Sequence, residues 1–169
     1  MRWFTIIVLS LALLLAGCVS EKSSMKVSSP SFSDGEYIPQ KYTCDGENIF
    51  PTLEFSDVPE EAKSLAIIMD DPDAPGGTFT HWIVWNIPAN VTEIKEGADL
   101  NYPQGENDFG DIGYGGPCPP KGTTHRYYFR VYALDTFLNL PEGATRSDLV
   151  KAMSGHIVAK ATLMGRYGR

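Results

Sequence analysis

The segment His125-Arg126-Tyr127-Tyr128-Phe129-Arg130-Val131-Tyr132-Ala133-Leu134 decides the fold class, because its side chains alternate with a period of two. One face of such a strand carries His125, Tyr127, Phe129, Val131 and Ala133, and the other carries Arg126, Tyr128, Arg130, Tyr132 and Leu134. Aromatic and β-branched residues are enriched in strands, and two residues is the strand repeat. We therefore expect a β-strand over 125–134, with His125 and Tyr127 on one side and Arg126 on the other.

Two further segments predict strands on the N-terminal side of this one. The run 64–69 is short and apolar and ends at a proline-rich turn, which suits a buried strand. The run 79–87 is aromatic and β-branched and ends at Pro88. Between residues 102 and 122 the chain is rich in Gly, Pro, Asn and Asp, and ordered loops of this length are often functional.

The C-terminal part of the sequence predicts a helix. Thr145-Arg146-Ser147-Asp148 offers an N-cap, and apolar residues then recur at helical spacing. These residues are Val150, Met153, Ile157, Ala161 and Met164, and Gly165 supplies a stop. We expect a helix of about five turns. The fold class is thus mostly β with a C-terminal α-helix, in one domain over residues 30–169, because no repeat or composition shift marks a second domain.

The composition is that of an ordinary globular domain with an acidic balance. Hydrophobic residues make up 43% and charged residues 21% of the 169 residues, and the formal net charge is −7. A nucleic-acid surface needs clustered lysine and arginine, and the sequence holds no such stripe. We therefore expect no nucleic-acid partner.

The first residues have the pattern of an export signal. Arg2 precedes an apolar run over 3–16 that is too short to span a bilayer as a helix. The ending Leu15-Ala16-Gly17-Cys18 resembles the lipobox of prokaryotic lipoproteins, in which the cysteine is lipidated and becomes the mature N-terminus. We predict a lipoprotein signal peptide over 1–17, then a lipidated Cys18 and a flexible, Ser-rich tether over 18–29. The alternatives are an ordinary signal peptide cut nearby and an uncleaved anchor.

Lipidation would hold the protein on the extracytoplasmic face of the cell membrane and would leave two other cysteines. Cys44 and Cys118 both lie in loops that carry Gly or Pro. In an exported, oxidising setting an even pair often forms a disulfide. Two separate, partly buried thiols are the alternative, and the sequence by itself leaves both open.

Polar side chains gather in two stretches of the sequence. In the first, Asp71 and Asp73 flank Pro72, which holds them in a stiff turn, and His81 follows. In the second, the Gly- and Pro-rich run 115–122 leads into His125 and Tyr127. A carboxylate beside a histidine favours the imidazolium, and the Tyr127 hydroxyl and the backbone N–H groups of the turn are further donors. These groups suit a small anion-binding pocket.

Each of these residues also has a purely structural interpretation. Asp and Pro are common in turns, where the side chains bind local backbone. A single histidine in an apolar strand is often a packed residue with no ligand. We read His156 as a packing or surface residue.

Several stretches resemble the phosphatidylethanolamine-binding protein family, most closely its prokaryotic, Raf-kinase-inhibitor-like branch. They are Asp71-Pro72-Asp73-Ala74-Pro75, Thr80-His81-Trp82, Gly116-Pro117-Cys118-Pro119-Pro120-Lys121-Gly122, His125-Arg126-Tyr127, Tyr42-Thr43-Cys44-Asp45-Gly46 and Asn107-Asp108-Phe109-Gly110. The resemblance covers roughly residues 31–169. It implies two antiparallel sheets and an anion pocket lined by Asp71, Asp73, His81, His125 and Tyr127, with Gly116, Pro117 and Cys118 in the adjoining loop. It also favours proximity of Cys44 and Cys118.

The expected function is that of a lipid-anchored binding module for a small phosphate- or carboxylate-bearing ligand, and the resemblance adds phospholipid head groups and phosphopeptides. One alternative is a regulator that inhibits an envelope protease or another protein partner, whose identity the sequence does not give. A second is a hydrolase, using either a metal ion held by His and Asp or Cys118 with His125 as base. We expect no catalytic residue, no cofactor and no metal ion, because the sequence carries neither a metal-ligand spacing nor a Gly-x-Ser-x-Gly elbow.

Overall fold

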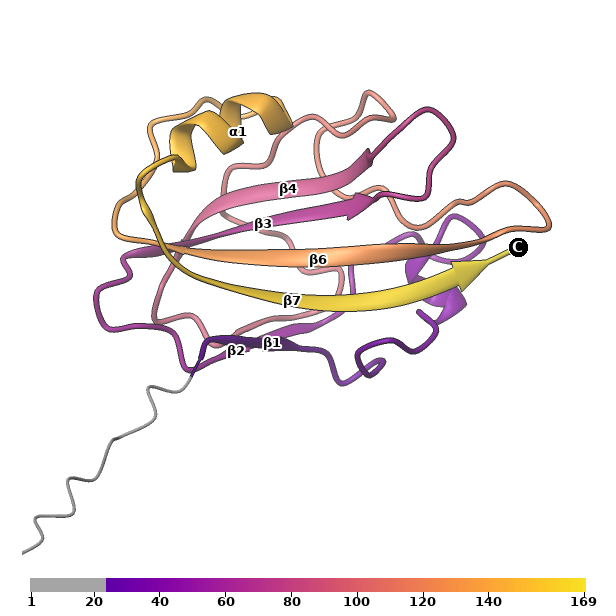
Figure 1. The fold of residues 1–169 in the computed structure, drawn as a ribbon, viewed down its shortest axis with the longest axis horizontal. Coiled ribbons are helices and arrows are strands. Elements are labelled where there is room, and N and C mark those ends of the chain that lie inside the picture. Colours follow the sequence, from indigo (N-terminus) through magenta and orange to yellow (C-terminus); the bar gives the residue numbers. More distant parts are fainter. Residues whose placement is uncertain (1–23) are drawn as a thin grey trace, which may run out of the picture.

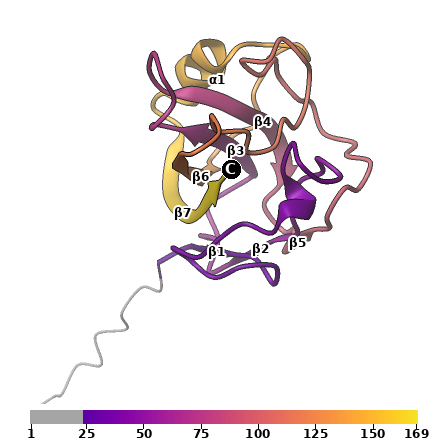
Figure 2. The ribbon, with the colours of Figure 1, turned by 90° about the vertical axis from the view of Figure 1, so that its right-hand side faces the viewer.

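The computed structural model describes residues 24–169, so the predicted signal peptide and the lipidation of Cys18 lie outside the described residues. Within this range the chain forms two antiparallel sheets and one α-helix, which confirms the predicted fold class (Figures 1 and 2). The larger sheet has the strand order β4-β3-β6-β7, and the smaller has the order β1-β2-β5. The bounds are β1 Lys26–Ser28, β2 Leu53–Ser56, β3 Ser64–Asp71, β4 Phe79–Pro88, β5 Glu93–Ile94, β6 Thr124–Leu134, α1 Arg146–Met153 and β7 Ile157–Gly168, with a short 3-10 helix at Gln40–Tyr42.

β3 is an inner strand of the larger sheet and is buried along its whole length. Its alternate residues Ala66 and Ile68 pack in a cluster with Leu149 of α1. Its other face packs toward the smaller sheet, which lies on the opposite side from α1 in Figure 2. A strand covered on both faces needs apolar side chains on both, which explains the continuous run over 64–69.

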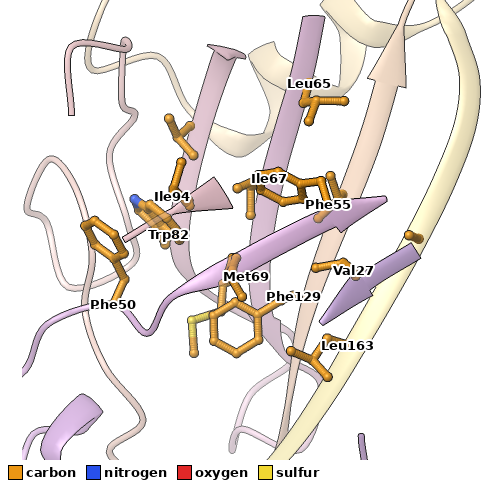
Figure 3. Close-up of a cluster of buried hydrophobic side chains, with 14 of the residues drawn as sticks. Val27, Phe50, Phe55, Leu65, Ile67, Met69, Trp82, Ile94, Phe129 and Leu163 are labelled. Carbon is orange, nitrogen blue, oxygen red and sulfur yellow. The ribbon is translucent and has the colours of Figure 1, made fainter. Parts of the chain in front are cut away.

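The space between the two sheets holds the main core. Figure 3 shows Val27 and Phe55 of the smaller sheet facing side chains of the larger one, among them Leu65 and Phe129. At one side of this cluster Phe50 stacks on Trp82, with their ring centroids 4.9 Å apart. Burying each such side chain stabilises the fold by roughly 1.5–3 kcal/mol, so this layer is the main source of stability.

The strand predicted over 125–134 is β6, and its alternation is confirmed. His125, Tyr127, Phe129, Val131 and Ala133 are buried, whereas Arg126 is exposed on the other face. β6 pairs with β7 from Thr124 opposite Gly168 to Leu134 opposite Ile157. The strands predicted over 64–69 and 79–87 are β3 and β4, with slightly longer bounds.

The predicted C-terminal helix is wrong in length. Thr145 caps α1 through a capping box with Asp148, as expected, but the helix ends at Met153 after eight residues. Gly155, with φ of +82°, turns the chain, and residues 157–168 then form β7. The apolar spacing of this segment fits a strand as well as a helix, and pairing along the whole length of β6 favours the strand. Within residues 24–169 no helix is long and apolar enough to cross a bilayer.

The predicted tether extends too far into the domain. Residues 18–29 were expected to lack structure, but Lys26–Ser28 form β1, which pairs with β2. The side chains of Met25 and Val27 are buried in the main core. Burial of these two apolar side chains makes the last part of this Ser-rich segment the first strand of the domain.

The strand directions bring the polar stretches to one end of the molecule. β3 ends at Asp71 opposite Phe79, where β4 begins, and β6 begins beside the end of β7. The C-terminus lies at this same end in Figure 1, whereas β1 begins toward the opposite end. The long segment over 102–122 lies along β4, where Gln104 bridges to Val84.

Candidate functional site

A small pocket opens where β3 ends and β4 and β6 begin. Its volume is about 250 Å³, slightly below the usual range for sites that bind drug-sized molecules. The pocket has three polar side chains, and the rest of its wall is largely apolar. It is lined by Asp71, Ala74, Pro75, Phe79, His81, Phe109, Cys118, Pro119, Pro120 and His125.

Asp71 and His125 form a buried pair in this pocket. The Nδ1 atom of His125 lies 2.7 Å from Oδ2 of Asp71, and both side chains are less than a tenth exposed. The other carboxylate oxygen of Asp71 accepts a hydrogen bond of 2.8 Å from the backbone N–H of Asp73. Nε2 of His125 faces the Thr123 hydroxyl at 3.3 Å, and that hydroxyl donates to the Pro120 carbonyl. Both nitrogens of His125 therefore have partners within the protein.

His81 is held differently. Its Nδ1 lies 2.7 Å from the carbonyl oxygen of Gly115, so Nδ1–H must be the donor. Burial lowers the pKa of His81, and the opposing effects of the Gly115 carbonyl and of the Asp71 charge do not overcome it. Of the two histidines expected beside a carboxylate, His125 is the one that pairs with Asp71, whereas desolvation dominates at His81.

Aromatic rings surround His81 on three sides. The ring centroids of Phe79, Phe109 and Tyr127 lie 5.0, 5.4 and 5.2 Å from its own. Phe109 and Phe79 also contact each other edge to face, at 4.7 Å. An environment of this kind excludes water and strengthens any electrostatic contact made inside it.

Tyr127 lies behind the two histidines and is fully buried. Its ring packs against both imidazoles, and no side chain or backbone group in residues 24–169 makes a hydrogen bond of good geometry with its hydroxyl. Burial raises the pKa of Tyr127, and the nearby Asp71 charge raises it further, so the phenol stays neutral. It is a neutral O–H donor beside the pocket.

Asp73 lies outside the pocket, although the resemblance implied a place in its wall. Its carboxylate binds Arg126 through three hydrogen bonds of 2.7 to 2.9 Å, two from the guanidinium and one from the backbone. These bonds lower the pKa of Asp73 to about 2. Asp71 and Asp73 thus take opposite directions from one turn, one toward His125 and the other toward the outer face of β6.

The loop over 115–120 closes one side of the pocket. A disulfide joins Cys118 to Cys44, with their Cα atoms 5.4 Å apart, so of the two alternatives the disulfide is present. Gly116 must be glycine, because a Cβ there would lie 2.5 Å from the carbonyl oxygen of Tyr42. A sulfur in a disulfide is not a nucleophile, so the hydrolase alternative that uses Cys118 lacks its nucleophile while the disulfide is formed.

The two glycine N–H groups of this loop have partners inside the protein. Gly115 N–H donates to the carbonyl of His81, and Gly116 N–H donates to the Asn48 side chain. Pro117 accepts a hydrogen bond from Cys44 N–H. These two glycine N–H groups, which belong to the turn expected to offer donors, hold the loop against its neighbours instead.

The structure thus brings together four of the predicted residues, Asp71, His81, Cys118 and His125, in the pocket wall. Phe79, Phe109 and Thr123 contribute to the site without having been predicted. Phe109 lies in the motif Asn107–Gly110, which the resemblance includes, but a single phenylalanine in a Gly-rich loop gives no signal of its own. Within residues 24–169 no group of three or more His, Cys, Asp or Glu side chains is arranged to hold a metal ion.

Comparison with known proteins agrees with this geometry. The sequence model of the family described as "Phosphatidylethanolamine-binding protein" matches residues 28–168. The UPF0098 protein PH1269 of Pyrococcus horikoshii is 53% identical, over 97% of this chain and 88% of its own length. A UPF0098 protein of Methanothermobacter thermautotrophicus is 50% identical, over 86% of this chain and 99% of its own.

Two solved structures share the fold. The phosphatidylethanolamine-binding protein homologue CT736 of Chlamydia trachomatis superposes with a TM-score of 0.83 at 50% identity, over 86% of this chain and 98% of its own. YbcL of E. coli, described as a member of the mammalian family, gives a TM-score of 0.81 at 34% identity, over 87% of this chain and 99% of its own. The match to the family model covers most of the sequence and the whole pocket. The chain therefore belongs to the phosphatidylethanolamine-binding protein family.

Proposed function

We propose that this protein is an extracytoplasmic lipoprotein whose domain binds a small phosphate- or carboxylate-bearing anion in the pocket of Asp71, His81 and His125. The observation that carries the proposal is the convergence of two imidazoles from different strands on one pocket of about 250 Å³. The neutral Tyr127 ring supports it, because it packs against both imidazoles beside the pocket. Family membership supports it too, since relatives carry the name phosphatidylethanolamine-binding protein.

The charges of the pocket are compatible with an anion. Asp71 would repel one if it stood alone, but its carboxylate is engaged by Nδ1 of His125 and by the backbone N–H of Asp73. The N–H groups of Gly115 and Gly116 and both nitrogens of His125 have partners, so Nε2 of His81 is the imidazole atom that would bind a ligand. The volume suits a group of the size of phosphate, acetate or phosphoethanolamine and excludes a long acyl chain.

The binding test is calorimetric titration of the purified protein in buffers free of phosphate and acetate. We expect heat of binding with phosphate, phosphoethanolamine or acetate, and its loss in His81→Ala. His156→Ala is the matched control, because His156 pairs with Asp135 in a half-exposed site away from the pocket. An unchanged circular dichroism spectrum of His81→Ala would separate lost binding from lost structure. No heat with any of the three anions would refute the proposal.

The anchor is tested separately. Cys18→Ala should move the protein from the membrane fraction to the soluble extracytoplasmic fraction, and the mature wild-type chain should carry the mass of a lipid on its N-terminal cysteine. An unchanged fractionation of the variant would contradict lipid anchoring and leave the anion-binding proposal standing.

A further inference from the structure

The two histidines of the pocket differ in what they can offer to a ligand. Both nitrogens of His125 are engaged, one by Asp71 and the other by Thr123. His81 uses only Nδ1, and its Nε2 has no hydrogen-bond partner of good geometry among residues 24–169. Since His81 lines the pocket, Nε2 is the imidazole atom that remains for a ligand.

The Gly115 carbonyl fixes the chemistry of that atom. A carbonyl oxygen only accepts, so Nδ1 of His81 keeps its proton in every protonation state of the ring. In the neutral ring Nε2 is therefore a bare lone pair. The oxygen of a fully deprotonated anion also carries only lone pairs, and the two atoms repel each other. A hydrogen bond between them exists only when a proton lies between them.

The surroundings of His81 hold the ring neutral until such an anion arrives. Burial lowers the pKa of His81, while the charges of Asp71 and Asp108 act in the opposite direction with less effect. On the β6 side the ring of His81 faces the neutral Tyr127. Beyond Tyr127 lies His125, which is paired with Asp71. No arginine or lysine is among the side chains that line the pocket. An anion in the pocket would itself become the nearest opposite charge, which favours an imidazolium.

We propose that anion binding in this pocket is coupled to the uptake of one proton, which lies between Nε2 of His81 and a ligand oxygen. This inference rests on the proposed anion-binding function and deepens it. The proton comes either with the ligand, as the P–O–H group of a phosphomonoester, or from solvent, in which case an N–H bond forms at Nε2. The preferred ligand class is therefore an oxyanion that carries an ionisable proton near neutral pH, as inorganic phosphate and phosphomonoesters do.

Permanently deprotonated oxyanions behave differently. Sulfate has the shape of phosphate but carries no proton near neutral pH, and the same holds for the phosphodiester of a lipid head group. For these anions His81 has to be protonated from solvent. Their affinity should then fall about tenfold for each pH unit above the pKa of His81, since one proton is taken up for each anion bound.

The test uses calorimetry with sulfate, phosphate and glycerophosphoethanolamine at pH 5.5 to 8.5, in pairs of buffers that differ in ionisation enthalpy. We expect close to one proton taken up per sulfate at pH 7.5. We also expect sulfate affinity to fall with rising pH, by about tenfold per pH unit above the pKa of His81, and phosphate to bind more tightly than sulfate at pH 7.5, by a margin that narrows at pH 5.5. Glycerophosphoethanolamine, a phosphodiester, should follow sulfate, whereas phosphoethanolamine should follow phosphate.

His81→Gln distinguishes proton-coupled from uncoupled binding, because an amide N–H donor does not titrate. It should bind sulfate with no proton uptake and with a flat pH profile, while His156→Gln should behave as the wild type. Sulfate binding to the wild type without proton uptake, at equal affinity from pH 5.5 to 8.5, would overturn this inference and leave the proposed function intact. Absence of binding by every anion at every pH would overturn both.

Discussion

Asp71 and Asp73 show how much of the site depends on single side chains. They flank one proline and look equivalent in the sequence, but one binds a buried histidine and the other binds an exposed arginine. The alternation of β6 determines which partner each one meets, because His125 points inward and Arg126 outward. The sequence therefore predicts both carboxylates as site candidates. Only the pairing of β6 with β3 shows that Asp71 faces the pocket and Asp73 does not.

Removing the charge of Asp71 should destabilise the fold. In Asp71→Asn the amide loses the charge-assisted contact with His125, and we expect a loss of about 1–3 kcal/mol in the free energy of unfolding, measured by urea denaturation. Asp135→Asn is the matched control, because the Asp135–His156 pair is half exposed and should change stability by less than about 0.5 kcal/mol. Equal effects of the two substitutions would contradict a special role for the buried pair.

The contribution of Asp73 should depend on pH. Its pKa is lowered from 3.8 to about 2 in the folded protein, so the pair with Arg126 stabilises the fold above pH 4. That stabilisation is lost as the pH falls through the interval from 4 to 2. The difference in unfolding free energy between the wild type and Asp73→Asn should therefore shrink toward zero at pH 2. A difference that stays constant from pH 7 to pH 2 would show that the ion pair contributes nothing to stability.

At the scale of elements, strands with a strict period or a continuous apolar run were predictable, and β3, β4 and β6 are found where expected. The C-terminal strand was not, because residues 157–164 fit a helical spacing as well as a strand. The signal that separates the two is Ser154-Gly155, where a glycine at positive φ ends α1. β1, β2 and β5 have two to four residues each, too few for any periodicity to be read.

The loop that carries Phe109 should set the size of ligand that the pocket admits. Asn107 and Asp108 anchor this loop, through Gly113 and Thr80, and Phe109 projects from it as a half-exposed ring. This ring lines both the pocket of about 250 Å³ and a neighbouring hollow of about 800 Å³ beside α1. Its removal should join the two.

We therefore expect Phe109→Ala to bind phenylphosphonate at least about tenfold more tightly than the wild type, with little change for phosphate. Titration calorimetry with both anions measures this ratio. Phe137→Ala is the control, since Phe137 is exposed to a similar degree and does not line the pocket. A wild-type protein that already binds phenylphosphonate as well as phosphate would rule out a size limit at this ring.

For the molecule as a whole, the sequence predicted one domain and an acidic surface, whereas the two-sheet architecture came from family resemblance. No local pattern could show that the segments of Cys44 and Cys118 meet, because they are 74 residues apart and join only through the loops that close the pocket. The roles of Phe109 and Thr123 likewise arise from contacts between separate loops and strands.

The disulfide should be a large single contribution to stability. A crosslink across 74 residues removes unfolded-state entropy worth about 4 kcal/mol in the chain-entropy account. The double variant Cys44→Ser, Cys118→Ser should lose stability of about this size in urea denaturation without reductant. A loss below about 1 kcal/mol would mean that the hydrogen bonds between the two loops already hold them in place.

The arrangement of the molecule also separates the pocket from the proposed anchor at Cys18. The pocket lies at the end where β3 stops, while β1 begins toward the other end (Figure 1). β7, which runs between these ends, has 12 residues and is about 40 Å long, whereas six residues of chain from Cys18 to residue 24 span at most about 20 Å. If Cys18 is lipidated as proposed, the pocket should therefore face away from the membrane.

Lipid-anchored protein on phosphatidylethanolamine vesicles should accordingly bind free phosphate as tightly as detergent-solubilised protein does. A flotation assay with radiolabelled phosphate compares the two. The opposite result is a phosphate affinity at least tenfold weaker on phosphatidylethanolamine vesicles and unchanged on phosphatidylglycerol vesicles. It would show that head groups of the same membrane occupy the pocket.

An anion bound in the pocket must lie close to the rings of His81 and His125, and nuclear magnetic resonance of the histidine rings detects that contact. The described domain has three histidines, and His156 is an internal reference because it lies on the surface and pairs with Asp135. On titration with phosphate, we predict saturable shifts of the ring signals of His81 and His125, with His156 unchanged. If the signals of all three histidines stay fixed, or if His156 responds as strongly as His81, anion binding in this pocket is contradicted.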